Sequence, residues 1–80
     1  MLREYIEAAM RHAQYERLSD DRSFYGDIPQ LPGVWANAAT LKETQQELRE
    51  VLEDWILLGL SRDDRLPAID GIALTVTGPI

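Results

Sequence analysis

Residues 40–60, TLKETQQELREVLEDWILLGL, constrain the fold of this chain more than any other stretch, because they predict one long amphipathic helix. Side chains suited to burial recur about every 3.6 residues, the period of an α-helix. They are Leu41, Thr44, Leu48, Val51, Leu52, Trp55 and Ile56. The other face is polar and mainly acidic: Glu43, Gln46, Glu47, Glu50, Glu53 and Asp54. A helix of this length requires a sheet or another helix to cover its apolar stripe.

The start of this helix is marked by Thr40 and Glu43, which form the capping-box pattern T-x-x-E. Glu43 and Glu47 also stand in the early turns, where negative charge suits the positive end of the helix dipole. The sequence therefore predicts that the helix begins at Thr40.

A second, shorter helix is predicted over residues 2–12. Its apolar face is rich in small side chains, so we expect it to pack closely on something larger. That face consists of Leu2, Tyr5, Ile6, Ala9, Met10 and Ala13. His12 is the only histidine. A single histidine at a helix end is typical of a capping or surface residue, since catalysis would require an orienting partner.

Three short strands are predicted between the helices, over residues 13–18, 24–28 and 34–38, because apolar and polar side chains alternate there. The polar turn 19–23 joins the first two strands as a hairpin. The prolines of segment 29–33 enforce extended geometry, and its Pro-Gly pair favours a tight turn with glycine at positive φ. Val34 and Trp35 should then lie on opposite faces of the sheet.

A fourth strand is predicted over residues 72–77, IALTVT, after the charged turn 61–65. The predicted fold is α+β with the order α-β-β-β-α-β. Its first three strands form an antiparallel meander, and the fourth runs parallel to the first and third after a right-handed crossover. Both helices are expected on one face of the sheet, which leaves the other face less protected. The apolar side chains expected to be exposed, or alternatively to fill corners of the core, are Tyr25, Trp35 and Leu57.

Composition limits the possible functions. Eighty residues predict a single small domain, for which self-association as a homodimer or larger oligomer is expected. Fourteen acidic residues against eight basic ones give a net charge of −6, which disfavours direct nucleic-acid binding and suits a basic partner. Cysteine is absent, and we identify neither a signal peptide nor a membrane span, so a cytoplasmic protein is expected.

Several of these motifs together resemble the HicB-like antitoxins. The family's usual pattern is a strand with an aromatic residue and a glycine, then I-P-x-L-P-G, a short strand, T-x-x-E and a helix with a tryptophan near its end. Here the matching features are found at Tyr15, residues 28–33, Thr40–Glu43, Trp55 and the Leu66-Pro67 turn. The resemblance covers nearly the whole chain and identifies residues 1–80 as a single HicB-like domain.

The resemblance implies a partial ribonuclease-H-like fold with strand order 3-2-1-4, and it implies oligomerisation. Many members of the family neutralise HicA, a small RNA-cleaving toxin. The chain departs from the pattern in two respects: Val34 stands where many relatives have cysteine, and the sequence lacks the C-terminal segment with which longer members bind their operator.

We therefore expect a non-catalytic interaction domain that covers a small basic toxin of the HicA type. The candidate partner-binding residues are Tyr25, Trp35, Glu43, Glu47, Glu50 and Asp54. An alternative is a stand-alone structural or regulatory oligomer with an unrelated partner.

A third possibility is a nuclease of the ribonuclease-H type, which would hold two metal ions about 4 Å apart with clustered carboxylates. The available acids are Asp20, Asp21, Asp27, Asp63, Asp64 and Asp70. Most stand in charged turns beside arginines, and Asp27 suits a strand surface. We expect no enzymatic activity, no catalytic or metal-ligating residues and no cofactor.

Overall fold

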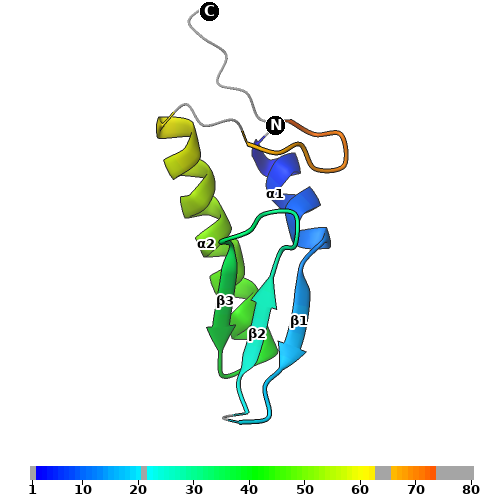
Figure 1. Cartoon of the computed structure of the whole chain (residues 1–80), viewed down its shortest axis with the longest axis vertical. Helices are drawn as coiled ribbons and strands as arrows, with labels where there is room; N and C mark the ends of the chain where they lie inside the picture. The colour runs from blue at the N-terminus through cyan, green and yellow to red at the C-terminus, as the bar shows by residue number, and fades with distance from the viewer. Residues whose placement is uncertain (1, 21, 63–65, 74–80) are drawn as a thin grey trace, which may run out of the picture.

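The computed structural model describes residues 2–20, 22–62 and 66–73. Its elements follow the order helix, three strands, helix (Figure 1). They are α1 (Leu2–Arg11), β1 (Gln14–Arg17), β2 (Phe24–Asp27), β3 (Trp35–Ala38) and α2 (Leu41–Ser61). These five predicted elements are confirmed, with ends that differ from the expected ones by one residue at most.

The strands form one antiparallel sheet in the order β1-β2-β3, so the predicted meander is confirmed. Gly26 of β2 pairs with Tyr15 of β1 and with Ala36 of β3. It lies on the buried face, where an added Cβ would stand 2.7 Å from the Tyr15 ring and 3.2 Å from Thr44 Cγ2. A glycine at this position therefore lets the Tyr15 ring and α2 close over the sheet.

The expected fourth strand, residues 72–77, falls mainly outside the described residues. Of this stretch the structure describes Ile72 and Ala73, and neither belongs to a strand. Ile72 instead forms an isolated bridge with Ile69. The strand order 3-2-1-4 and the ribonuclease-H-like fold thus remain predictions.

Helix α2 packs against β2 and β3 and supplies the centre of the core. A row that advances four residues at each step is fully buried: Thr44, Leu48, Leu52 and Ile56. The Thr40 hydroxyl accepts a hydrogen bond from the Glu43 backbone N–H at 3.1 Å, which confirms the predicted cap. The assignment of Leu41 to the buried stripe is wrong, because Leu41 stands three residues before Thr44, to the side of this row, and is exposed.

Helix α1 packs against α2 and lies beyond the end of the strands (Figure 1). For the three strands that the structure describes, the prediction that both helices cover the sheet is therefore wrong for α1. The reason is geometric: α1 leads into β1 through two residues, and α2 with 21 residues is far longer than strands of four. A helix rises about 1.5 Å per residue and a strand about 3.3 Å, so α2 extends well past the sheet. Helix α1 packs against the part of α2 that the sheet does not cover. Ala8 and Ala9 are fully buried and let the helices approach closely, whereas Leu2, expected on the buried face, is exposed at the helix end.

Residues 66–72 complete this part of the core. Leu66 and Ile69 are buried, and the Tyr5 hydroxyl donates to the Pro67 carbonyl at 2.6 Å. Asp70 and Gly71 both have positive φ, so the segment turns tightly, with mutual backbone hydrogen bonds between Ile69 and Ile72 of 3.0 and 2.8 Å. The turn matches an Asp-Gly hairpin turn, whose central residues require positive φ.

Candidate protein-interaction surface

One face of the sheet is covered by α2, and the other carries alternate side chains from the three strands. Tyr25 and Asp27 of β2 point to this open face, because Gly26 between them is buried on the core side and side chains alternate along a strand. Trp35 joins them from β3, directly opposite Asp27 in the register, and Glu16 joins from β1, directly opposite Tyr25. The open face therefore combines two aromatic rings with two carboxylates.

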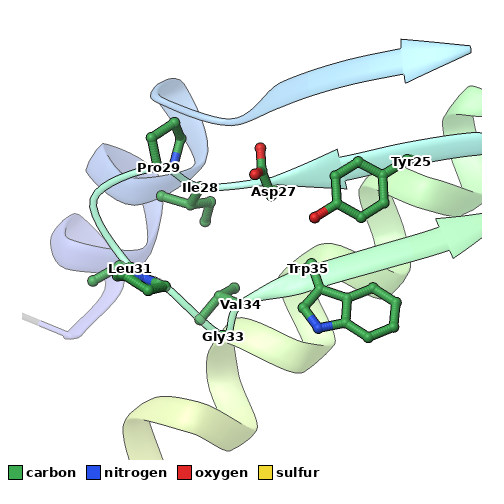
Figure 2. Close-up of a pocket in the computed structure, with 9 residues that line it drawn as sticks. Tyr25, Asp27, Ile28, Pro29, Leu31, Gly33, Val34 and Trp35 are labelled. Atoms are coloured by element: carbon green, nitrogen blue, oxygen red, sulfur yellow. The ribbon is translucent and has the colours of Figure 1, made fainter.

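The rings of Tyr25 and Trp35 lie side by side on adjacent strands (Figure 2). Their centroids are 6.1 Å apart and their planes are inclined by 25°, which is a stacked arrangement. The Trp35 side chain is 54% exposed, and Tyr25 is half-buried. The predicted exposure is confirmed for Trp35, whereas Tyr25 lies between the exposed surface and the buried corner that we considered as alternatives.

Leu57, the third residue expected to be exposed, is 59% exposed but belongs to a different surface. It lines a hollow between α1 and α2, together with Leu2, Ile6 and Ile56. The expected apolar residues thus occupy two separate places on the molecule.

Trp35 lies between two hollows. The smaller, of about 200 Å³, is framed by the loop 29–33 and lined by Tyr25, Asp27 and Trp35 among others (Figure 2). The larger, of about 550 Å³, lies between β3 and α2, and its lining includes Glu47 and Val51. Of the residues that we expected to bind a partner, Trp35 therefore shares the smaller hollow with Tyr25 and the larger one with Glu47.

Each of the two hollows carries a carboxylate. Within the described ranges, neither Asp27 nor Glu47 forms an ion pair. We name Tyr25, Asp27, Trp35, Asn37 and Glu47 the Trp35 surface. Its aromatic faces and carboxylates have the chemistry that binds arginine and lysine side chains.

The other expected acidic residues lie farther along α2. Glu50 and Asp54 are exposed and line neither hollow beside Trp35. Glu43 is exposed as well, but its Oε1 accepts a hydrogen bond from the Thr40 hydroxyl at 3.1 Å, so it has a role in capping the helix. Of the four acids, only Glu47 lies beside Trp35.

A polar cluster around His12 was not foreseen. The His12 Nε2 lies 2.7 Å from Asp70 Oδ1, and its Nδ1 lies 3.1 Å from the Gln30 side-chain nitrogen. Arg11 also approaches Asp70, at 3.4 Å. The hydrogen bond and charge of His12, and then the hydrogen bond and charge of Arg11, lower the pKa of the Asp70 carboxyl.

This cluster has a structural role. Both ring nitrogens lie within hydrogen-bond distance of side chains from other parts of the fold, Asp70 on one side and Gln30 on the other. The cluster thus ties α1 to the loop 29–33 and to the turn at Asp70. The Asp-Gly pair could have indicated that turn from the sequence, but not its position against His12, which is 58 residues away.

The acids considered for a nuclease do not come together in the part of the chain that the structure describes. Asp20, Asp27 and Asp70 belong to three separate places, and no group of three or more potential metal ligands is found among described residues. Asp21, Asp63 and Asp64 lie outside those residues. No helix in the described ranges is both long and apolar enough to span a membrane.

Comparisons with known proteins place the chain in a family. The model of the UPF0150-like family matches residues 4–67, most of the chain. The chain belongs to the UPF0150-like family. Its structure is similar to the crystal structure of the TTHA0281 protein from Thermus thermophilus, with 42% sequence identity and a TM-score of 0.89. That similarity covers 95% of this chain and 94% of the Thermus protein. A comparison with curated proteins gives no match.

Proposed function

We propose that this UPF0150-like protein is a non-catalytic antitoxin of the HicB type, which binds a small basic RNA-cleaving toxin of the HicA type and neutralises it. The observation that carries the proposal is the Trp35 surface, where stacked aromatic rings adjoin the carboxylates of Asp27 and Glu47. A large exposed tryptophan in an acidic setting suits a protein partner with cationic side chains.

The chemistry of the toxin supports this pairing. A protein that cleaves RNA must hold a phosphate backbone, and it does so with lysine and arginine. An acidic antitoxin can occupy that same cationic surface and so exclude RNA. The net charge of −6 also favours encounter with a basic partner, because opposite potentials increase the association rate.

The HicB-like motif at residues 28–33 has a clear structural consequence at this surface. Ile28 and Leu31 are buried and Gly33 adopts a φ of 97°, as expected for the Pro-Gly turn. Val34 is buried as well, which leaves Trp35 directed outward (Figure 2). The motif thus presents the aromatic side chain that we assign to partner binding.

Co-expression with a HicA-type toxin tests the proposal. We expect the native chain to restore growth of cells that express the toxin and to co-purify with it. Trp35→Ala should weaken the complex by about tenfold or more, as for a central aromatic contact, which corresponds to about 1.4 kcal/mol. Leu58→Ala is the matched control, because Leu58 is 50% exposed and does not line either hollow.

One result would contradict the assigned binding surface, and another would contradict the antitoxin function itself. Equal binding by the Trp35→Ala and Leu58→Ala variants would place the contact on another surface. A native chain that neither binds nor neutralises the toxin would exclude the antitoxin function.

A further inference from the structure

We infer that the basic partner contacts the Trp35 surface through an extended segment that pairs, as an added strand, with the outer edge of β3. The inference rests on the proposed function and specifies how the partner is bound. It follows from three features: a strand edge with which no described strand pairs, a hollow beside that edge, and the charge around it.

In the part of the chain that the structure describes, no strand lies along the edge of β3 on the side away from β2. The strand pairs with β2 in the register Gly26–Ala36 and Phe24–Ala38, and no other described strand pairs with it. The Ile28 N–H donates to the Val34 carbonyl at 3.3 Å, so the backbone groups of Val34, and by alternation those of Ala36, face β2.

Trp35 and Asn37 therefore direct their backbone N–H and C=O groups outward. A row of outward N–H and C=O groups is a template for another strand.

The larger hollow lies where an added strand would run. Ala36 and the half-buried Val51 are among the apolar residues that line it, and Glu47 adds a carboxylate. Side chains of a strand alternate between its two faces. One set would enter the hollow against Val51, and the other would lie beside the Trp35 ring and Asp27. A segment in which apolar and cationic residues alternate can place its apolar side chains in the hollow and its cationic side chains beside Trp35 and Asp27.

Charge favours a basic segment over a second copy of this chain. A two-fold pairing of β3 with β3 would place both α2 helices on the same face of the joined sheet. The Glu47 carboxylates of the two copies would then flank the junction, and each copy has a net charge of −6. Like charges placed across an interface disfavour association. Arginine or lysine side chains at the same place neutralise Glu47 and Asp27.

Amide hydrogen exchange measured by NMR tests the pairing, with a short blocked peptide of alternating arginine and valine as the probe. We expect the peptide to slow exchange of the Trp35 and Asn37 amides by about tenfold or more, since they gain hydrogen-bond acceptors. The amides of Ala36 and Ala38 already face β2 and should change little. A glutamate–valine peptide is the charge control and should not bind.

A pair of variants isolates the backbone contribution. The Asn37 side chain donates to Ser23 Oγ at 2.9 Å and to the Phe24 carbonyl at 2.8 Å, and both Asn37→Ala and Asn37→Pro remove these bonds. Only Asn37→Pro also removes the outward N–H, a change that an edge strand accepts. We expect Asn37→Pro to bind the peptide about tenfold more weakly than Asn37→Ala.

A peptide with N-methylated valines provides the reciprocal test if the proline variant does not fold, and it should bind more weakly than its parent. Strand addition would be overturned if the two Asn37 variants bound the peptide with equal affinity, or if the N-methylated peptide bound as tightly as its parent. Unchanged exchange of the Trp35 amide would overturn it as well. A native dimer that Asn37→Pro dissociates, without peptide protection, would assign the edge to a second copy. The toxin experiment decides the proposed function separately, because an antitoxin that binds by side chains alone still loses affinity in Trp35→Ala.

Discussion

Leu52 stands at the centre of the buried row of α2 and is fully inaccessible to solvent. Leu52→Ala removes three carbon atoms from a core that has few other residues to close the gap, so we expect a loss of about 2–5 kcal/mol in the free energy of unfolding. That is a large part of the stability of a small domain. Thermal and denaturant unfolding provide the measurement. Leu58→Ala, at an exposed position of the same helix that lines none of the hollows described above, should change stability by about 0.5 kcal/mol or less.

Asp70 gives a pH dependence to the contact between α1 and the turn that follows α2. Its pKa is lowered in the folded chain by the His12 hydrogen bond and by Arg11, so the ionised form stabilises the fold. This contribution is complete above the unfolded pKa, about 3.9, and is lost as the pH falls through the lower folded pKa.

Asp70→Asn should therefore lower the melting temperature at pH 7, and its difference from the native chain should shrink below about pH 4. Asparagine accepts the positive φ of this position, so the turn is retained. Asp20→Asn is the control, because Asp20 has no ion-pair partner among the residues described. A constant difference between Asp70→Asn and the native chain from pH 7 to pH 3 would contradict the role of this carboxylate.

At the scale of the elements, the sequence was most informative where one residue type is tied to one local geometry. The cap at Thr40, the row through Leu52 and the turn at Gly33 all follow from local rules, and each is present. The position of α1 does not follow from such a rule. An amphipathic pattern shows that a face is buried, but it does not identify the covering element.

The same distinction applies to the candidate site. Alternation along β2 and β3 predicted that Tyr25 and Trp35 face outward. The place of Glu47 beside Trp35 depends on how α2 crosses the sheet, which helical periodicity leaves open. The His12–Asp70 contact joins residues 58 positions apart and had no local signal.

Charge reversal on α2 tests whether this helix contributes to the encounter with a basic partner. Glu47→Lys combined with Glu50→Lys changes the net charge from −6 to −2, because each exchange adds two charges. We expect association with the toxin to slow by about tenfold and to depend less on salt, with little change in melting temperature, since both side chains are exposed.

The control for this pair is Glu7→Lys with Asp20→Lys, which makes the same change in net charge away from α2. Stopped-flow association over a series of salt concentrations separates the two cases. Equal slowing in both double variants would show that only the total charge matters. Unchanged association in the α2 variant would move the contact entirely to the open face of the sheet.

At the scale of the whole molecule, the described residues present two different surfaces. The Trp35 surface combines aromatic and acidic groups, whereas the hollow between α1 and α2 is mainly apolar and is lined by Leu2, Ile6, Glu53, Ile56 and Leu57. The first suits a basic partner. The second suits an apolar one, and a second copy of the chain offers the same leucines in a two-fold arrangement.

We therefore predict a homodimer at micromolar concentration that buries the hollow between the helices. Sedimentation should give about twice the 9.1 kDa of the chain. Leu57→Gln should shift the equilibrium to the monomer, whereas Leu41→Gln, which changes an exposed leucine at the other end of α2, should not. Because each copy has a net charge of −6, added salt should strengthen this apolar dimer while it weakens the complex with a basic toxin. A 9.1 kDa species alone, at all salt concentrations, would contradict the prediction.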